Sequence, residues 1–201
     1  MWRAGLAHPW AKVLVGLLCG APLLCLGWAA WAEQLGANPA EALIRGTGDW
    51  ALRVLCLALA ITPLRVGLKL PVLARWRRMV GLWAFAYAAC HVLAYAWLDM
   101  GLDMGDILRD ISKRPFILVG VCTVAILVAL AATSFNQAIR WMGASRWQYV
   151  HRSVYLAGVL AVLHFFWMRA SKNNLTEVFL YAGLIGGLLG WRLWRWWARQ
   201  A

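Results

Sequence analysis

The sequence is poor in charged residues, and the charge that it carries is one-sided. Asp, Glu, Lys and Arg make up only 14% of the 201 residues, whereas 63% are apolar. Only eight residues are acidic, against 20 lysines and arginines. A soluble domain of this size would carry far more charge. The shortage of charge excludes an ordinary soluble domain and predicts a membrane protein.

Cysteine pairs with the spacing of a redox or haem-attachment motif are also lacking. The five cysteines are scattered through apolar runs, at Cys19, Cys25, Cys56, Cys90 and Cys122. None belongs to a CxxC or CxxCH motif, so the sequence predicts neither a disulfide framework nor a covalently attached haem. A buried cysteine is usually a small apolar residue. Any haem would then be held without a covalent link, as a b-type haem.

Long apolar runs are abundant. Residues 13–32 and 115–139 contain no charged residue, and residues 79–98 are interrupted only by His91. Each run is long enough to cross about 30 Å of hydrocarbon as a helix. No separate soluble domain is left over. We therefore expect one polytopic membrane domain that covers residues 1–201.

Six transmembrane helices are predicted from these runs and from weaker ones. The expected ranges are 11–32, 48–66, 78–98, 115–138, 150–169 and 176–196. The second span has an uncharged stretch of only 11 residues, 54–64. It can cross the bilayer only if Arg53 and Arg65 extend toward opposite membrane faces.

The distribution of basic residues predicts the orientation. With six spans, 13 lysines and arginines fall at the two ends of the chain and in the loops on the same side, against seven on the other side. Cytoplasmic segments carry the excess of Lys and Arg, so both termini are predicted to be cytoplasmic. The basic residues flank apolar spans and form no separate basic domain. We therefore expect a lipid bilayer, and no nucleic acid, as their partner.

Three histidines lie in or beside these apolar stretches: His91, His151 and His164. An ionisable residue inside a bilayer is costly and is a candidate for function, and imidazole is a common ligand of haem iron. His91 follows Arg78 by 13 residues, and His164 follows His151 by 13 residues, roughly 20 Å along a helix. Both helices are predicted to start in the cytoplasm. His91 and His164 should therefore lie at similar depth and could ligate one haem between two helices.

His151 is expected near the cytoplasmic face, away from this pair. On a regular helix its side chain would point about 140° away from that of His164. A tilt, a bend or a π-bulge would be needed for both to face one groove. Otherwise His151 serves another site, such as an inner haem, a flavin or a quinone. For any single histidine, a hydrogen-bonded packing role is the alternative.

Three arginines are candidates for cofactor contacts. Arg53 is expected near the outer end of the second helix, where it could pair with a haem propionate. Its alternative role is to extend to the outer surface. Arg77 and Arg78 could bind the phosphate or carboxylates of an inner cofactor. Their alternative role is to set the membrane topology.

Several stretches, in order along nearly the whole chain, resemble the MsrQ (YedZ) family of haem-binding membrane subunits. They are Leu35-Gly36-Ala37-Asn38-Pro39, Ile61-Thr62-Pro63-Leu64, residues 77–83 leading into His91, Ser112-Lys113-Arg114-Pro115-Phe116, and residues 147–155 leading into His164. The stretches before His91 and around His151 are the most specific. No departure is seen at the three histidines.

The resemblance implies a ferric-reductase-like transmembrane fold in the bacterial inner membrane, with haem b and FMN as cofactors. Electrons would come from a cytosolic flavin reductase or from the quinone pool. They would pass to MsrP, a periplasmic molybdopterin subunit on which methionine sulfoxide in proteins is reduced. This chain would then be an electron-transfer subunit, and the family's histidines fall on His91, His151 and His164.

Two other functions stay open from the residues alone. A small transporter could use the histidines to relay protons, although the spans contain few carboxylates for such a path. A b-type cytochrome could instead oxidise quinol at His151 and pass the electrons to another acceptor. The loop after the third span carries Asp99, Asp103, Asp106 and Asp110. These residues could dock a periplasmic partner or merely be solvated.

Overall fold

The structure is a computed structural model that describes residues 8–170 and 175–200. Every regular element in these residues is helical, which confirms an all-α protein. The chain divides into two compact units, residues 1–107 and 108–201. A single haem-binding domain across the whole chain stays a prediction.

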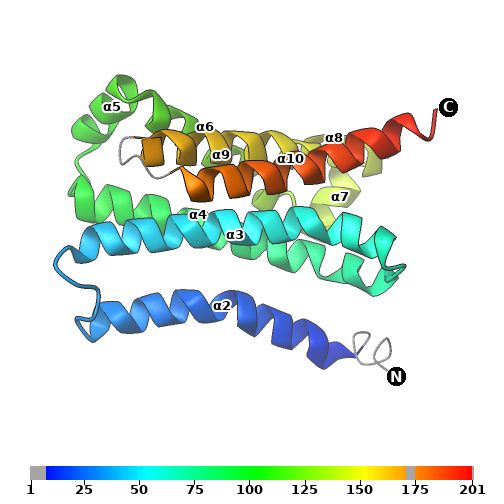
Figure 1. The fold of residues 1–201 in the computed structure, drawn as a ribbon, viewed down its shortest axis with the longest axis horizontal. Coiled ribbons are helices and arrows are strands. Elements are labelled where there is room, and N and C mark those ends of the chain that lie inside the picture. The colour runs from blue at the N-terminus through cyan, green and yellow to red at the C-terminus, as the bar shows by residue number, and fades with distance from the viewer. Residues whose placement is uncertain (1–7, 171–174, 201) are drawn as a thin grey trace. The chain divides into compact units, whose positions relative to one another are not determined.

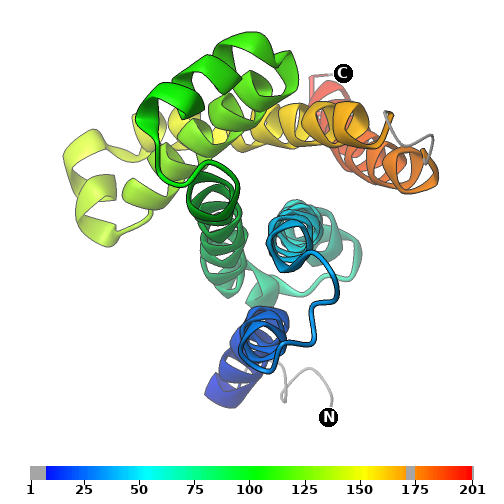
Figure 2. The same ribbon diagram turned by 90° about the vertical axis from the view of Figure 1, so that its left-hand side faces the viewer.

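The first unit contains three long helices, α2 (Pro9–Trp31), α3 (Pro39–Gly67) and α4 (Arg77–Ala94). A short 3-10 helix, η1 (Pro71–Arg75), joins α3 to α4, and a π-helical turn, η2 (Tyr95–Asp99), continues α4. The helices α3 and α4 pack side by side, and α2 contacts both (Figures 1 and 2). The core of this unit therefore lies between three helices.

Glycines bring α2 close to α4. A Cβ atom on Gly16 would lie 3.2 Å from the sulfur of Met79, and one on Gly20 would lie 2.7 Å from the ring of Trp83. The two glycines are four residues apart and share a helix face, as do Met79 and Trp83. Small residues at this spacing allow membrane helices to pack closely. Dispersion contacts between α2 and α4 therefore replace the hydrophobic effect that would join helices in water.

Tyr87 joins the same two helices by hydrogen bonds. Its side chain is fully buried, and its hydroxyl contacts α2 next to Pro22. A proline inside a helix removes one backbone hydrogen bond and disturbs its neighbours. A side-chain hydroxyl inserted there can satisfy the groups that are disturbed.

The second unit is built on α6 (Pro115–Ala132), α9 (Val154–Ala170) and α10 (Thr176–Trp197). The helix α9 packs against both α6 and α10 (Figure 1). Arg169 near the end of α9 forms an ion pair of 2.8 Å with Glu177 at the start of α10. Two short helices, α7 (Asn136–Met142) and α8 (Ala144–Arg152), connect α6 to α9, and α5 (Met104–Lys113) precedes α6.

The helix ends differ from the predicted ranges at three places. The helix α3 starts nine residues before the predicted residue 48, with Pro39 at its first turn and Asn38 Oδ1 accepting the Glu41 amide hydrogen. The helix α6 ends at Ala132 instead of 138. The predicted helix 150–169 is α8 followed by α9, with a break at Ser153. The Ser153 amide there bonds to the Val150 carbonyl, one residue closer than in an α-helix.

Five segments of the described chain are long and apolar enough to cross a membrane. They are Pro9–Trp31, Pro39–Gly67, Arg77–Asp99, Pro115–Ala132 and Ala144–Ala170. The helix α10 forms where the sixth span is predicted, but it carries Glu177, Arg192 and Arg195 and is not one of the five. The chain is therefore a multi-pass membrane protein. A sixth span and cytoplasmic termini stay predictions.

Candidate functional site

His91 lies on α4 with its ring against α3. Its Nδ1 atom is 2.8 Å from the backbone carbonyl oxygen of Ile44. A carbonyl oxygen can only accept a hydrogen bond, so Nδ1 carries the hydrogen and donates it. A neutral imidazole with its hydrogen on Nδ1 has its lone pair on Nε2. The hydrogen bond to Ile44 therefore leaves His91 with an Nε2 atom that can accept a hydrogen bond or bind a metal.

Gly48 makes room for this ring. A Cβ atom on Gly48 would lie 3.0 Å from Nδ1 of His91 and 3.1 Å from its Cε1. Ile44 and Gly48 are four residues apart, so they lie one turn apart on the same face of α3. The carbonyl of one turn binds the ring, and the glycine of the next turn lets the ring come close enough to be bound.

The second unit contains the same arrangement around His164. Nδ1 of His164, on α9, is 2.7 Å from the carbonyl oxygen of Phe116 on α6. A Cβ atom on Gly120 would lie 3.0 Å from both Nδ1 and Cε1 of His164. Phe116 and Gly120 are again four residues apart. His164 therefore also donates from Nδ1 and has its lone pair on Nε2.

Even the spacing along the chain is nearly equal in the two units. The histidine follows its carbonyl partner by 47 residues in the first unit and by 48 in the second. Each unit thus presents one imidazole, fixed by one backbone carbonyl and one glycine. That His91 and His164 lie at the same depth and share one ligand stays a prediction, as does their role as iron ligands.

His151 lies at the end of α8 in a different setting. Its Nε2 atom is 3.2 Å from the hydroxyl oxygen of Thr133, whose own hydrogen is donated to the Ala129 carbonyl at 2.7 Å. Nε2 of His151 is therefore the donor to Thr133. Trp147 stacks on the histidine ring at 3.9 Å between centroids and donates its indole N–H to the Thr133 carbonyl at 2.8 Å. The break at Ser153 separates this cluster from the helix of His164.

Arg53 is further inside its helix than expected. Because α3 begins at Pro39, Arg53 is the fifteenth of its 29 residues and does not lie near an end. Its guanidinium carbon is 4.9 Å from the centre of the Trp50 ring, and Trp50 stacks on Tyr87 at 6.2 Å. Arg53 follows Gly48 by five residues, roughly 7.5 Å along the axis. It therefore lies about one and a half turns beyond the level of the His91 ring.

Arg77 and Arg78 are the first two residues of α4, and both are exposed. The N-terminal end of a helix carries partial positive charge and free backbone N–H groups. The two arginines add to this positive charge. A helix start of this kind can bind a phosphate or carboxylate, and the cofactor role of Arg77 and Arg78 stays a prediction.

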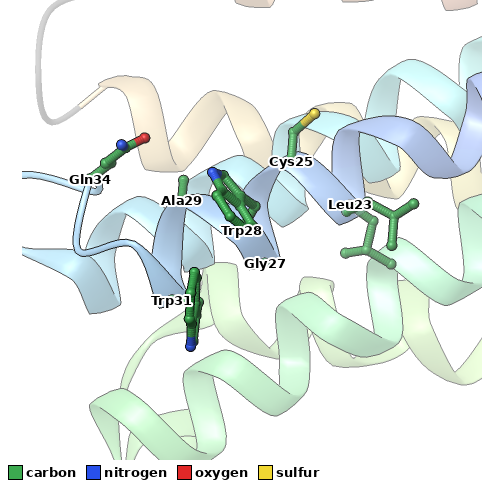
Figure 3. Close-up of a pocket in the computed structure, with 8 residues that line it drawn as sticks. Leu23, Cys25, Gly27, Trp28, Ala29, Trp31 and Gln34 are labelled. Carbon is green, nitrogen blue, oxygen red and sulfur yellow. The ribbon is translucent and has the colours of Figure 1, made fainter.

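Figure 3 shows a hollow in the first unit whose lining includes none of these histidines and arginines. It is lined by α2 and the residues just after it, from Leu23 to Gln34, and Gln34 is its only amide side chain. Trp28 and Trp31, 5.0 Å apart between ring centroids, form part of its wall. An exposed apolar lining of this kind is typical of a lipid-facing surface. The hollow therefore contributes no chemistry to the site.

A metal site made wholly of side chains is not present in the part of the chain that the structure describes. No group of three or more His, Cys, Asp or Glu side chains gathers there. Single imidazoles on separate helices suit an iron that takes its other ligands from a macrocycle. The sequence predicted the histidines but missed Gly48, Gly120, Thr133 and Trp147. Glycines in helices and aromatic residues in an apolar chain are too common to single out.

Comparisons with known proteins agree with this architecture. Residues 47–162 match the family described as ferric reductase like transmembrane component. A protein of Polaromonas naphthalenivorans (strain CJ2) is 58% identical over 98% of this chain and 92% of its own length. A protein of Bordetella parapertussis is 48% identical over 86% of this chain and 84% of its own.

A protein of Caulobacter vibrioides is 44% identical over 90% of this chain and 85% of its own. All three carry the name protein-methionine-sulfoxide reductase haem-binding subunit MsrQ. The similarity covers α3, α4, α6 and α9, the helices that hold His91 and His164. The chain therefore belongs to the MsrQ family and contains a ferric-reductase-like transmembrane domain.

Proposed function

We propose that the chain carries electrons across the bacterial inner membrane as the haem-binding subunit of a protein-methionine-sulfoxide reductase system. Electrons enter from a cytosolic flavin reductase or the quinone pool, and FMN and haem b are the cofactors. The electrons are then transferred to MsrP, the periplasmic molybdopterin subunit on which methionine sulfoxide is reduced. The observation that carries this proposal is the pair of intramembrane histidines, His91 and His164, each donating Nδ1–H to a backbone carbonyl.

The residues fit a haem for a chemical reason. A histidine that binds a metal through Nε2 usually donates its Nδ1–H to a carbonyl or carboxylate, which fixes the ring and makes it a stronger donor. Both His91 and His164 have this partner. A haem bound by two imidazoles supplies a centre that takes up and releases one electron and has no open position for oxygen. His91 and His164 would hold its iron, and Arg53 would pair with a propionate.

The cytoplasmic end of the pathway is proposed to use His151 with Arg77 and Arg78. The two arginines would hold the phosphate of FMN or the carboxylates of an inner haem at the start of α4. Nε2–H of His151 is donated to Thr133, so an iron at Nε2 would have to replace that bond. A flavin or a quinone would not need to coordinate the imidazole of His151, because a hydrogen bond from the ring is enough to hold it.

The periplasmic partner is proposed to dock near the acidic segment that runs from Asp99, at the end of η2, to Asp110 in α5. Asp103 and Asp110 have local partners. Asp103 accepts the amide hydrogens of Gly105 and Asp106 at 2.7 and 3.0 Å, and Asp110 pairs with Arg114 at 2.9 Å. Substitution of Asp99 is therefore the cleaner test of docking, because Asp103 also caps α5.

The first experiment is spectroscopy of the purified protein in detergent. Oxidised and dithionite-reduced absorption spectra, pyridine haemochrome and acid-released flavin are measured for the wild type, His91→Ala and His164→Ala. We expect a b-type spectrum in the wild type that is lost in both variants. His8→Ala is the matched control, because His8 only caps the exposed start of α2.

The outcomes separate the proposed function from its rivals. A colourless wild type that stays colourless after haem supplementation would overturn electron transfer and favour a transporter. A b-type spectrum that quinol reduces directly, without transfer to MsrP, would favour a quinol-oxidising cytochrome with another acceptor. A flavin that is retained in His91→Ala but lost in Arg77→Gln would support the inner site.

A further inference from the structure

We propose that Gly48 and Gly120, together with the carbonyls of Ile44 and Phe116, are positioning elements that set the direction and the donor strength of the two histidine ligands. The proposal rests on the proposed function, because it concerns how His91 and His164 bind iron. The proposal assigns a role to two glycines that would otherwise only lower the stability of their helices.

The hydrogen bonds that hold the two rings are short. They measure 2.8 Å from His91 to Ile44 and 2.7 Å from His164 to Phe116, at the short end of the usual range for an N–H donor and a carbonyl. Each carbonyl places the hydrogen on Nδ1 and increases the electron density at Nε2. A stronger imidazole donor stabilises ferric iron more than ferrous iron. The two carbonyls should therefore lower the reduction potential of the haem.

Glycine gives each ring access to its carbonyl. Each carbonyl belongs to a helix, where the side chain one turn further along would cover its outer lone pair. At both places that residue is glycine, and a Cβ atom would lie 3.0 Å from Nδ1 of the ring. Ordinary van der Waals contact needs more room, so a larger residue would require the ring to shift by a few tenths of an ångström and would weaken its hydrogen bond to the carbonyl. Glycine is required here for space, since both residues lie within regular helices.

The same arrangement occurs twice in the chain. The helix pairs α3 with α4 and α6 with α9 show it independently, in separate compact units. Other helical glycines do not share it. A Cβ atom on Gly27 or Gly190 would meet nothing within 4 Å, and one on Gly20 would meet a tryptophan. A Cβ atom on Gly16 would meet a methionine and one on Gly46 a leucine, whereas those on Gly48 and Gly120 would meet a histidine ring.

The test compares Gly48→Ala and Gly120→Ala with Gly27→Ala and Gly190→Ala, which add the same methyl group to a helix in open space. Haem affinity is measured by titration of the apoprotein, the reduction potential by spectroelectrochemistry, and the ligand field by EPR of the ferric haem. We expect haem affinity to fall about 10–100-fold in the first two variants, with a higher potential and shifted g values. The two controls should match the wild type.

A second test leaves both glycines in place. In His91→Gly and His164→Gly, added imidazole should enter the vacated position, bind iron and donate its other N–H to the carbonyl. Added 1-methylimidazole binds iron equally well but has no N–H to donate. We expect imidazole to bind up to about tenfold more tightly, in line with one hydrogen bond. This comparison stays informative even if an alanine variant fails to fold.

Failure of the inference is distinguishable from failure of the proposed function. If His91→Ala loses haem but Gly48→Ala and Gly120→Ala keep the affinity and potential of the controls, the glycines are not positioning elements, and the proposed function stands. Equal binding of imidazole and 1-methylimidazole would likewise overturn the role of the carbonyls. A wild type that binds no haem would overturn the proposed function and this inference together.

Discussion

The hydroxyl of Tyr87 on α4 donates a hydrogen bond of 2.8 Å to the carbonyl oxygen of Cys19 on α2. The oxygen of the same hydroxyl accepts the amide hydrogen of Leu23 at 3.0 Å. In a regular α-helix the Leu23 amide would bond to the Cys19 carbonyl, four residues earlier, and Pro22 lies between the two residues. The hydroxyl of Tyr87 thus satisfies a carbonyl and an amide group of α2 beside its proline. Lipid could not hydrogen-bond to these groups.

Tyr87→Phe should therefore loosen α2. The change removes only the hydroxyl, so the backbone groups of Cys19 and Leu23 lose a shared partner in an apolar setting. We expect a loss of about 1 kcal/mol of unfolding free energy, because hydrogen bonds between membrane helices are worth no more than about 2 kcal/mol. Reversible unfolding in mixed micelles measures it. Tyr149→Phe, at a side chain that is 78% exposed, is the control and should change nothing.

Gly20→Ala should separate α2 from α4. The new methyl group would lie 2.7 Å from the rigid ring of Trp83, which cannot move aside without disturbing Tyr87. Overpacking of this kind costs about 1–3 kcal/mol. Thermal denaturation in detergent is the measurement, and Gly27→Ala on the same helix is the control. Equal stability of the two variants would show that α2 does not pack closely through Gly20.

Arg53→Gln should lower the reduction potential of the haem. A nearby positive charge favours the reduced state, which carries one more negative charge, and its removal favours the oxidised state. Arg45→Gln is the control on the same helix, because Arg45 pairs with Glu41 at an exposed position. Redox titration of both variants is the measurement. An unchanged potential in Arg53→Gln would argue against a partner role for Arg53.

His151→Ala should slow electron entry while the spectrum of the outer haem stays intact. Trp147→Phe keeps an aromatic ring beside His151 but removes the indole N–H that binds the Thr133 carbonyl, so it should have a smaller effect in the same direction. Stopped-flow reduction by the flavin reductase or by quinol is compared with reduction by dithionite. An unchanged rate of physiological reduction in His151→Ala would contradict a role in electron entry.

The sequence predicted most of the long helices because an uncharged run of about 18 residues or more is rarely anything except a membrane span. It missed the start of α3, because two charged residues and a glycine (Arg45, Gly46 and Asp49) interrupt the apolar pattern there and are typical of a loop. The signal was nevertheless present, since Asn38 before Pro39 is typical of a capped helix start. The end of α6 was missed because residues 133–138 are uncharged. The structure places a turn and the start of a new helix there.

The site was predicted in part for similar reasons. Histidines are rare in apolar helices and draw attention, so His91, His151 and His164 were found. Their hydrogen-bond partners are mostly backbone carbonyls, which every residue has, and the glycines beside them are recognised only once two helices are packed together. The angle between His151 and His164 predicted that a tilt, a bend or a π-bulge would be needed for both to face one groove, and that they face one groove stays a prediction. The structure has a break at Ser153, two residues after His151.

The clamped rings of His91 and His164 have a thermodynamic consequence. A side chain that is already immobile has lost its rotational freedom during folding, so a cofactor that binds it does not meet that cost again. A haem without a thioether link is retained only by its coordinate bonds and its pocket. Rings that cannot swing away slow its escape, because a broken iron–nitrogen bond re-forms before the haem can leave. The glycine turns of α3 and α6 would then take over part of the retention that thioether bonds provide in proteins with covalently attached haem.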